Sequence, residues 1–78
     1  MSRLNELKVK AQQIDVDLAE VYRAIETIPD SLPWSEFCRR LNNLETRGIE
    51  LEEQRKRIQR EIELYEDILE EVRNAVAS

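Results

Sequence analysis

The sequence predicts an all-α fold, an antiparallel two-helix coiled-coil hairpin with a longer second helix that oligomerises as a dimer or a four-helix bundle. Three observations support this prediction. Only one glycine and two prolines occur among the 78 residues, and 37% of the residues are charged, a composition typical of long helices. Apolar residues recur at alternating spacings of three and four in both halves of the chain, and the two prolines lie close together between these halves. We therefore expect a single domain over residues 1–78.

The first helix is expected over residues 2–28. Ser2 can cap its N-terminus, because a serine hydroxyl accepts a hydrogen bond from an unpaired N–H of the first turn. Pro29 disfavours the α conformation at Ile28 and so ends the helix. The seam positions of this helix are Leu4, Leu7, Ala11, Ile14, Leu18, Val21, Ile25 and Ile28, which follow a seven-residue repeat.

A turn is expected over residues 29–33, and the second helix over residues 33–76. Asp30 or Ser31 can cap this helix. Pro33 is tolerated in its first turn, because the missing N–H would be unpaired there. The second seam has the same spacing as the first and consists of Trp34, Phe37, Leu41, Leu44, Gly48, Leu51, Arg55, Ile58, Ile62, Tyr65, Leu69, Val72 and Val76.

Folding the chain back at the turn aligns the two seams, with each a position facing a d position. The expected pairs are Ile28–Trp34, Ile25–Phe37, Val21–Leu41, Leu18–Leu44, Ile14–Gly48, Ala11–Leu51, Leu7–Arg55 and Leu4–Ile58. We expect Gly48 to form a packing notch opposite Ile14; close approach of another helix is the alternative. Arg55 is expected to extend its charge outward along its aliphatic stem, with an ion pair to Glu6 or Glu52 as the alternative.

In this alignment the second helix continues well beyond the first, and no part of the chain covers its apolar stripe. A small domain with such a stripe favours association, so we expect a dimer or tetramer formed through residues 58–77. An antiparallel crossing near Tyr65 is favoured, because it brings Arg60 of one copy towards Glu70 and Glu71 of the other. A different protein that covers the stripe is the alternative. The predicted interface residues are Ile62, Tyr65, Ile68, Leu69, Val72 and Val76.

Aromatic residues stand at the closed end of the hairpin. Trp34 and Phe37 are expected to plug this end by packing against Ile25 and Ile28. The alternative is that Leu32, Trp34 and Phe37 form a tip that contacts another molecule.

The composition argues against catalysis. The chain has no histidine and one cysteine, which excludes a Cys/His zinc site and a Cys–His nucleophilic pair. One glycine cannot build a glycine-rich phosphate loop. A di-metal bundle site requires acidic residues that point into the core, and no acidic residue occupies a seam position here. We therefore expect no enzyme activity, no metal or other cofactor, and no small-molecule substrate.

The charge argues against nucleic-acid binding, since the net charge is −5. Arg55, Lys56, Arg57 and Arg60 form a basic cluster that could contact phosphates. Acidic residues surround this cluster, however, so we expect a solvated, salt-bridged face and no direct binding of nucleic acid. No apolar run is long enough for a membrane span or a signal peptide. One cysteine fits a reducing compartment, so a cytoplasmic location is expected.

Several short motifs resemble the coiled-coil insertion of large serine recombinases over residues 4–62. The stretches that carry this resemblance are Leu18–Glu26, Pro29-Asp30-Ser31, Arg40–Glu45 and Leu51-Glu52-Glu53. The resemblance implies a hairpin that helps to bring two DNA sites together during DNA recombination, through a tip at about residues 28–37 that contacts another subunit's hairpin. The catalytic serine domain and the zinc-binding cysteines of that family are not found in this sequence.

The sequence therefore favours a non-enzymatic module for oligomerisation or protein–protein interaction, with a subunit-contact hairpin of recombinase type as one form of it. One alternative is a small subunit resembling those of secretion needles, or one of their helical co-chaperones. Another is a small phage or plasmid regulator that binds a host protein.

Overall fold

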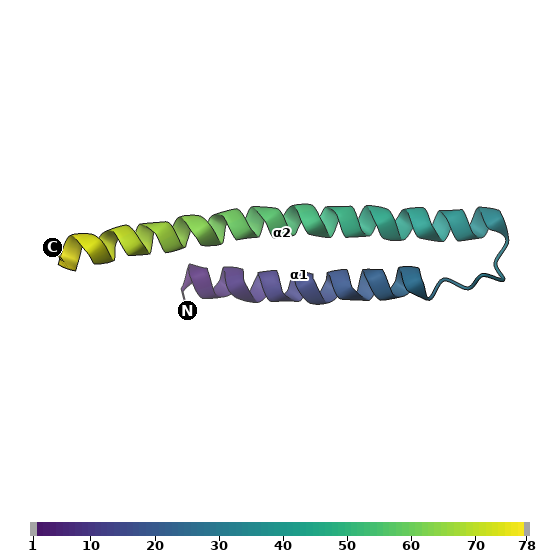
Figure 1. Cartoon of the computed structure of the whole chain (residues 1–78), viewed down its shortest axis with the longest axis horizontal. Coiled ribbons are helices and arrows are strands. Elements are labelled where there is room, and N and C mark those ends of the chain that lie inside the picture. The colour runs from purple at the N-terminus through teal and green to yellow at the C-terminus, as the bar shows by residue number, and fades with distance from the viewer. Residues whose placement is uncertain (1, 78) are drawn as a thin grey trace.

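Two antiparallel α-helices form a hairpin in the computed structural model, which describes residues 2–77. Helix α1 spans Arg3–Glu26 and helix α2 spans Trp34–Ala77. The described chain is a rod of 67 × 17 × 16 Å, in which α2 continues beyond both ends of α1 (Figure 1). The predicted all-α hairpin is confirmed.

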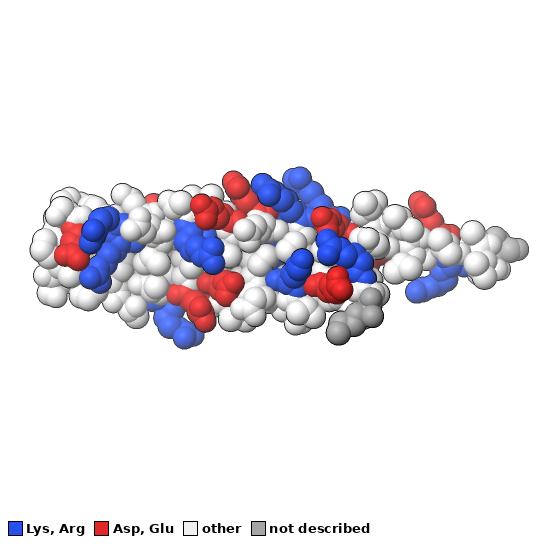
Figure 2. Space-filling view, turned by 180° about the vertical axis from the view of Figure 1, so that it is seen from behind, with Lys and Arg blue, Asp and Glu red and all other residues white. Residues whose placement is uncertain are grey.

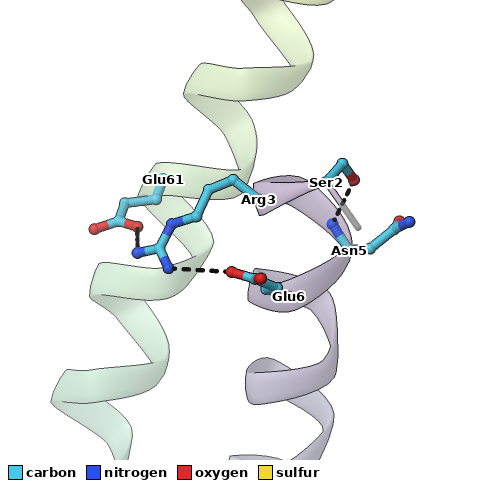
Figure 3. A network of polar contacts seen from close by, with 5 residues as sticks. All are labelled: Ser2, Arg3, Asn5, Glu6 and Glu61. Atoms are coloured by element: carbon cyan, nitrogen blue, oxygen red, sulfur yellow. Dashed lines mark hydrogen bonds and ion pairs between the residues drawn. The ribbon is translucent and has the colours of Figure 1, made fainter.

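Helix α1 begins at the predicted cap. Ser2 has an extended backbone, and its hydroxyl accepts a hydrogen bond from the backbone N–H of Asn5 at 3.2 Å (Figure 3). At the other end the helix stops at Glu26, two residues earlier than expected. Thr27 takes the capping position, where its hydroxyl donates to the carbonyl of Arg23 at 2.9 Å. Thr27 thus satisfies a carbonyl of the last turn, and Ile28, the residue before Pro29, lies outside the helix.

The segment between the helices covers residues 27–33, which is longer than the expected turn. The prediction that Asp30 or Ser31 caps α2 is wrong, because Pro33 occupies the position immediately before the helix. The carbonyl of Pro33 accepts a hydrogen bond from the N–H of Phe37 at 2.9 Å and so starts the helical ladder. The first residue of α2 is therefore Trp34.

The seam between α1 and α2 has a different register from the expected one. Val21 was expected to face Leu41, but its Cγ1 atom lies 3.5 Å from the place that a β carbon on Gly48 would occupy. Leu7 was expected to face Arg55, but it packs in one buried cluster with Ile62. In both cases the partner lies seven residues further along α2. The predicted register is therefore wrong by one heptad.

The seven-residue repeat of the two seams explains why the predicted register was wrong. Because both seams repeat every seven residues, a shift of one helix by seven residues still pairs every a position with a d position. The turn decides between the two alignments. Since α1 ends at Glu26 and the chain needs residues 27–33 to reach Trp34, the last layers of α1 lie deeper along α2 than a tight turn would place them.

The register also determines the partner of Arg55, the one charged seam residue. Its Nε atom donates to Asp15 Oδ1 at 3.0 Å, and its Nη1 atom donates to Gln59 Oε1 at 2.9 Å. The alternative prediction of an ion pair with Glu6 or Glu52 is wrong, because the shifted register brings Asp15 to this position. The guanidinium is thus satisfied at the edge of the seam.

A substitution at Gly48 tests the packing of the seam. Gly48 is buried in α2 without a positive φ, and a β carbon there would be at ordinary van der Waals distance from Val21. Because glycine is a poor helix former, we expect Gly48→Ala to raise the free energy of unfolding by about 1 kcal/mol, measured by urea titration with circular dichroism.

The matched control is Ala19→Gly on the exposed face of α1, which we expect to lower the free energy of unfolding by a similar amount. A loss of stability in Gly48→Ala would contradict this account and would indicate that another helix approaches closely at Gly48.

Candidate interaction surface

The C-terminal part of α2 extends past the start of α1, and we call residues 67–77 the overhang. At the start of α1, Arg3 forms ion pairs with Glu6 of its own helix at 3.7 Å and with Glu61 of α2 at 3.5 Å (Figure 3). Lys8 pairs with Glu66 at 3.8 Å, and among the described residues this is the ion pair between the helices that lies furthest along α2. Beyond it α2 runs alone (Figure 1).

One face of the overhang, and of the helical turn of α2 that precedes it, is apolar and exposed. The exposed fraction of the side chains rises from 39% at Tyr65 to 82% at Val76, as the cover provided by α1 comes to an end. Leu64 is also exposed and lies at the edge of this face. We call this surface the apolar stripe; its members are Tyr65, Ile68, Leu69, Val72 and Val76.

Ile62 does not belong to the apolar stripe, although it was predicted as an interface residue. Its exposed fraction is 5%, because Leu7 and Ala11 of α1 pack against it. The predicted register placed the end of α1 one heptad earlier and so left Ile62 uncovered. The uncovered part of α2 is consequently shorter than expected.

A shallow groove lies where α1 begins. Leu4 of α1 and Leu69 of α2 supply its apolar part, and charged side chains form the rest. Its lining residues are Leu4, Glu66, Leu69, Glu70, Arg73 and Asn74. The groove connects the buried seam with the apolar stripe, so a helix that lies on the stripe would also contact the N-terminal end of α1.

The charged residues do not form a single basic face. Arg55 of the predicted basic cluster is held by Asp15. The other three members, Lys56, Arg57 and Arg60, are exposed. Figure 2 shows acidic and basic groups intermixed along the two-helix part of the face that it draws. This arrangement is typical of a solvated surface.

The tip of the hairpin carries a second exposed apolar group. Trp34 is 78% exposed, and its ring stacks on Phe37 with the centroids 6.0 Å apart and the planes inclined by 13°. The prediction that Trp34 plugs the hairpin end is wrong, because the register leaves it beyond the end of α1. Phe37 and Leu32 are half-buried.

The described residues show neither a metal centre nor a membrane span. Within residues 2–77 no group of three or more His, Cys, Asp or Glu side chains could hold a metal ion. Neither α1 nor α2 is apolar enough over a sufficient length to cross a membrane. No protein-family model matches the sequence, and neither a curated protein nor a solved structure is significantly similar to it.

The hydrogen bond between the two helices at Tyr22 gives a prediction on pH. The Tyr22 hydroxyl donates to Glu52 Oε1 at 2.8 Å. This bond, together with the negative charge of Glu52, raises the pKa of Tyr22 above its ordinary value. The bond therefore stabilises the hairpin fully below the pKa of an unfolded tyrosine, and the stabilisation is lost as the pH rises through the raised pKa.

We expect Glu52→Ala to lower the pKa of Tyr22 towards its ordinary value, measured from the absorbance of tyrosinate. The background is Tyr65→Phe, which leaves one of the two tyrosines. The control is Glu53→Ala at the neighbouring exposed acid. Identical titration curves for the two alanine variants would contradict the bond.

Proposed function

We propose that this chain is a non-enzymatic protein–protein association module, and that it self-associates through the apolar stripe of α2. One observation carries the proposal: the stripe holds five large apolar side chains that are at least 39% exposed, and four of them continue the heptad positions of the buried seam. Removing such a surface from water is favourable, and a second copy of the chain supplies a matching surface.

The charges favour an antiparallel contact between two α2 helices. A parallel contact would bring the acidic residues of the overhang, such as Glu70 and Glu71, close to those of the other copy. An antiparallel crossing near Tyr65 instead brings Arg60 of one copy towards these acids of its partner. Each such exposed ion pair contributes about 0.2–1 kcal/mol, so the charges set the orientation and the apolar stripe supplies most of the affinity.

The hairpin need not open for this contact. Leu64 and Ile68 are both about half exposed, so they lie on a flank of α2 that α1 leaves open. Two α2 helices can meet along this flank while each keeps its own α1, which gives a four-helix arrangement. Because the uncovered part of α2 is short, we expect a reversible dimer with a dissociation constant of about 1 μM or weaker.

The one free cysteine, Cys38, adds a proposal about location. A single unpaired thiol fits a reducing compartment, and we therefore place the module in the cytoplasm.

Two charged substitutions in the stripe test self-association. We expect Leu69→Asp with Val72→Asp to remain a monomer at concentrations where the wild-type chain forms dimers, because four buried carboxylates would be introduced per dimer. The measurement is molar mass by light scattering over a hundredfold range of concentration.

The matched control is Val9→Asp with Val16→Asp on the outer face of α1. These valines are 64% and 52% exposed, close to the values at the stripe, so both variants add two aspartates at half-exposed aliphatic positions and differ in the face that carries them. The control should dimerise like the wild type. Equal association of both double variants would contradict the stripe as the interface. Ile62→Asp is unsuitable for this test, since it would unfold the core.

The exposed Trp34 supports a second candidate, a subunit contact at the tip as in the recombinase-type hairpin. In that case Trp34→Ala would abolish the association, and the Leu69→Asp, Val72→Asp variant would retain it. Filaments at high concentration would instead favour a needle-like subunit. A wild-type chain that stays monomeric would favour a different protein as the partner of the stripe.

A further inference from the structure

The seam of this hairpin fits the same heptad pattern in two alignments. In the structure Val21 packs against Gly48. One heptad back along α2, Val21 would face Leu41 and Ile14 would face Gly48. Every seam residue of α1 has a partner in both alignments, and both pair a positions with d positions. We propose that the hairpin has two helix registers one heptad apart, and that sliding between them exchanges the residues exposed at its two ends.

The two registers differ in the layers at the ends of the seam. In the observed register Ile62 is buried and Tyr65 is partly covered, whereas Trp34 is exposed at the tip. In the other register Trp34 and Phe37 would pack against Ile28 and Ile25, and Ile62 and Tyr65 would be uncovered. One pair of large side chains replaces another, so the buried apolar area is similar in the two registers.

The turn permits this slide in one direction. To reach the second register, α1 advances towards the tip by seven residues, or about 10.5 Å. This movement shortens the gap that residues 27–33 now span, since α2 extends beyond the end of α1 at the tip (Figure 1). A slide in the opposite direction would widen the gap by the same distance, and seven fully extended residues reach at most about 25 Å, so the turn opposes that slide.

Polar contacts favour the observed register. Arg55 pairs with Asp15 at 3.0 Å and Lys8 pairs with Glu66 at 3.8 Å. One heptad back, Arg55 would leave Asp15 and approach Lys8, which has the same charge. Because these pairs are partly or largely exposed, they bias the equilibrium without fixing it, and we expect the second register at about 0.1–10% of the molecules.

The slide links the two ends of the rod. This link rests on the proposed function, because it requires a partner on the apolar stripe. A partner that also covers Ile62 and Tyr65 favours the second register and draws Trp34 into the seam. By thermodynamic reciprocity, a ligand that holds Trp34 at the tip opposes that partner.

Disulfide trapping distinguishes the registers in a Cys38→Ser background, which leaves no other thiol. Val21→Cys is combined with Gly48→Cys for the observed register, with Leu41→Cys for the second one, and with Arg55→Cys as the control. These three positions of α2 are equivalent in the heptad, and the Arg55 pair would need a slide in the direction that the turn opposes. The measurement is made in a glutathione buffer, at a concentration of the chain low enough for it to be monomeric.

We expect the two thiols of the Gly48 pair to have the highest effective concentration. The effective concentration of the thiols in the Leu41 pair should be about ten- to a thousandfold lower, and the Arg55 pair should form no disulfide. A Leu41 pair that forms no more disulfide than the Arg55 pair overturns the second register. This result is independent of self-association, whose failure appears separately as a constant molar mass of the wild-type chain.

Trp34, the only tryptophan, reports the exchange at the tip. In the form trapped through Leu41 we expect a blue-shifted emission and weaker quenching by acrylamide than in the form trapped through Gly48, because the indole enters the seam. A disulfide at Leu41 with unchanged quenching of Trp34 overturns the link between the register and the tip.

Discussion

Burial of one heptad seam between α1 and α2 is the interaction on which the rest of this molecule depends. The described chain has no buried polar residue and no disulfide, and each fully buried aliphatic side chain contributes about 1.5–3 kcal/mol. The exposed ion pairs contribute about 1 kcal/mol or less each. The seam therefore determines that a hairpin forms, while the weaker polar contacts and the turn favour the observed register. The core residues are Leu7, Ala11, Ile14, Val21, Leu51 and Ile62.

The surface available for association follows directly from where this seam ends. Helix α2 is longer than α1 at both ends, so each end presents apolar side chains that no residue of the hairpin covers fully. One end carries the apolar stripe and the other carries Trp34 stacked on Phe37. Both surfaces belong to one continuous helix, which explains how a change of register at the seam would affect both.

Local signals in the sequence predicted the fold well, because heptad spacing and the Ser2 cap depend only on neighbouring residues. The register could not be predicted in this way, since a periodic seam is unchanged by a shift of one repeat. Helix α1 ends two residues earlier than expected, with Thr27 as its cap. Arg55 pairs with Asp15, a partner that only the folded hairpin brings near. Because of this single error in the register, Ile62 was predicted to be exposed although it lies in the core, and Trp34 was predicted to be packed although it lies at the surface. The acid that pairs with Arg55 could have been found by testing each heptad shift for charge complementarity.

Hydrogen exchange of the intact chain, followed by mass spectrometry at a low and a high concentration, tests the central claim most directly. The account predicts that the amides of α1 and of α2 from Leu44 to Glu66 are protected at both concentrations, because the seam covers this part of the two helices. Amides in the overhang, residues 67–77, should exchange fast in the dilute sample and become protected in the concentrated one. Overhang amides with the same exchange rate at both concentrations would contradict self-association through the apolar stripe.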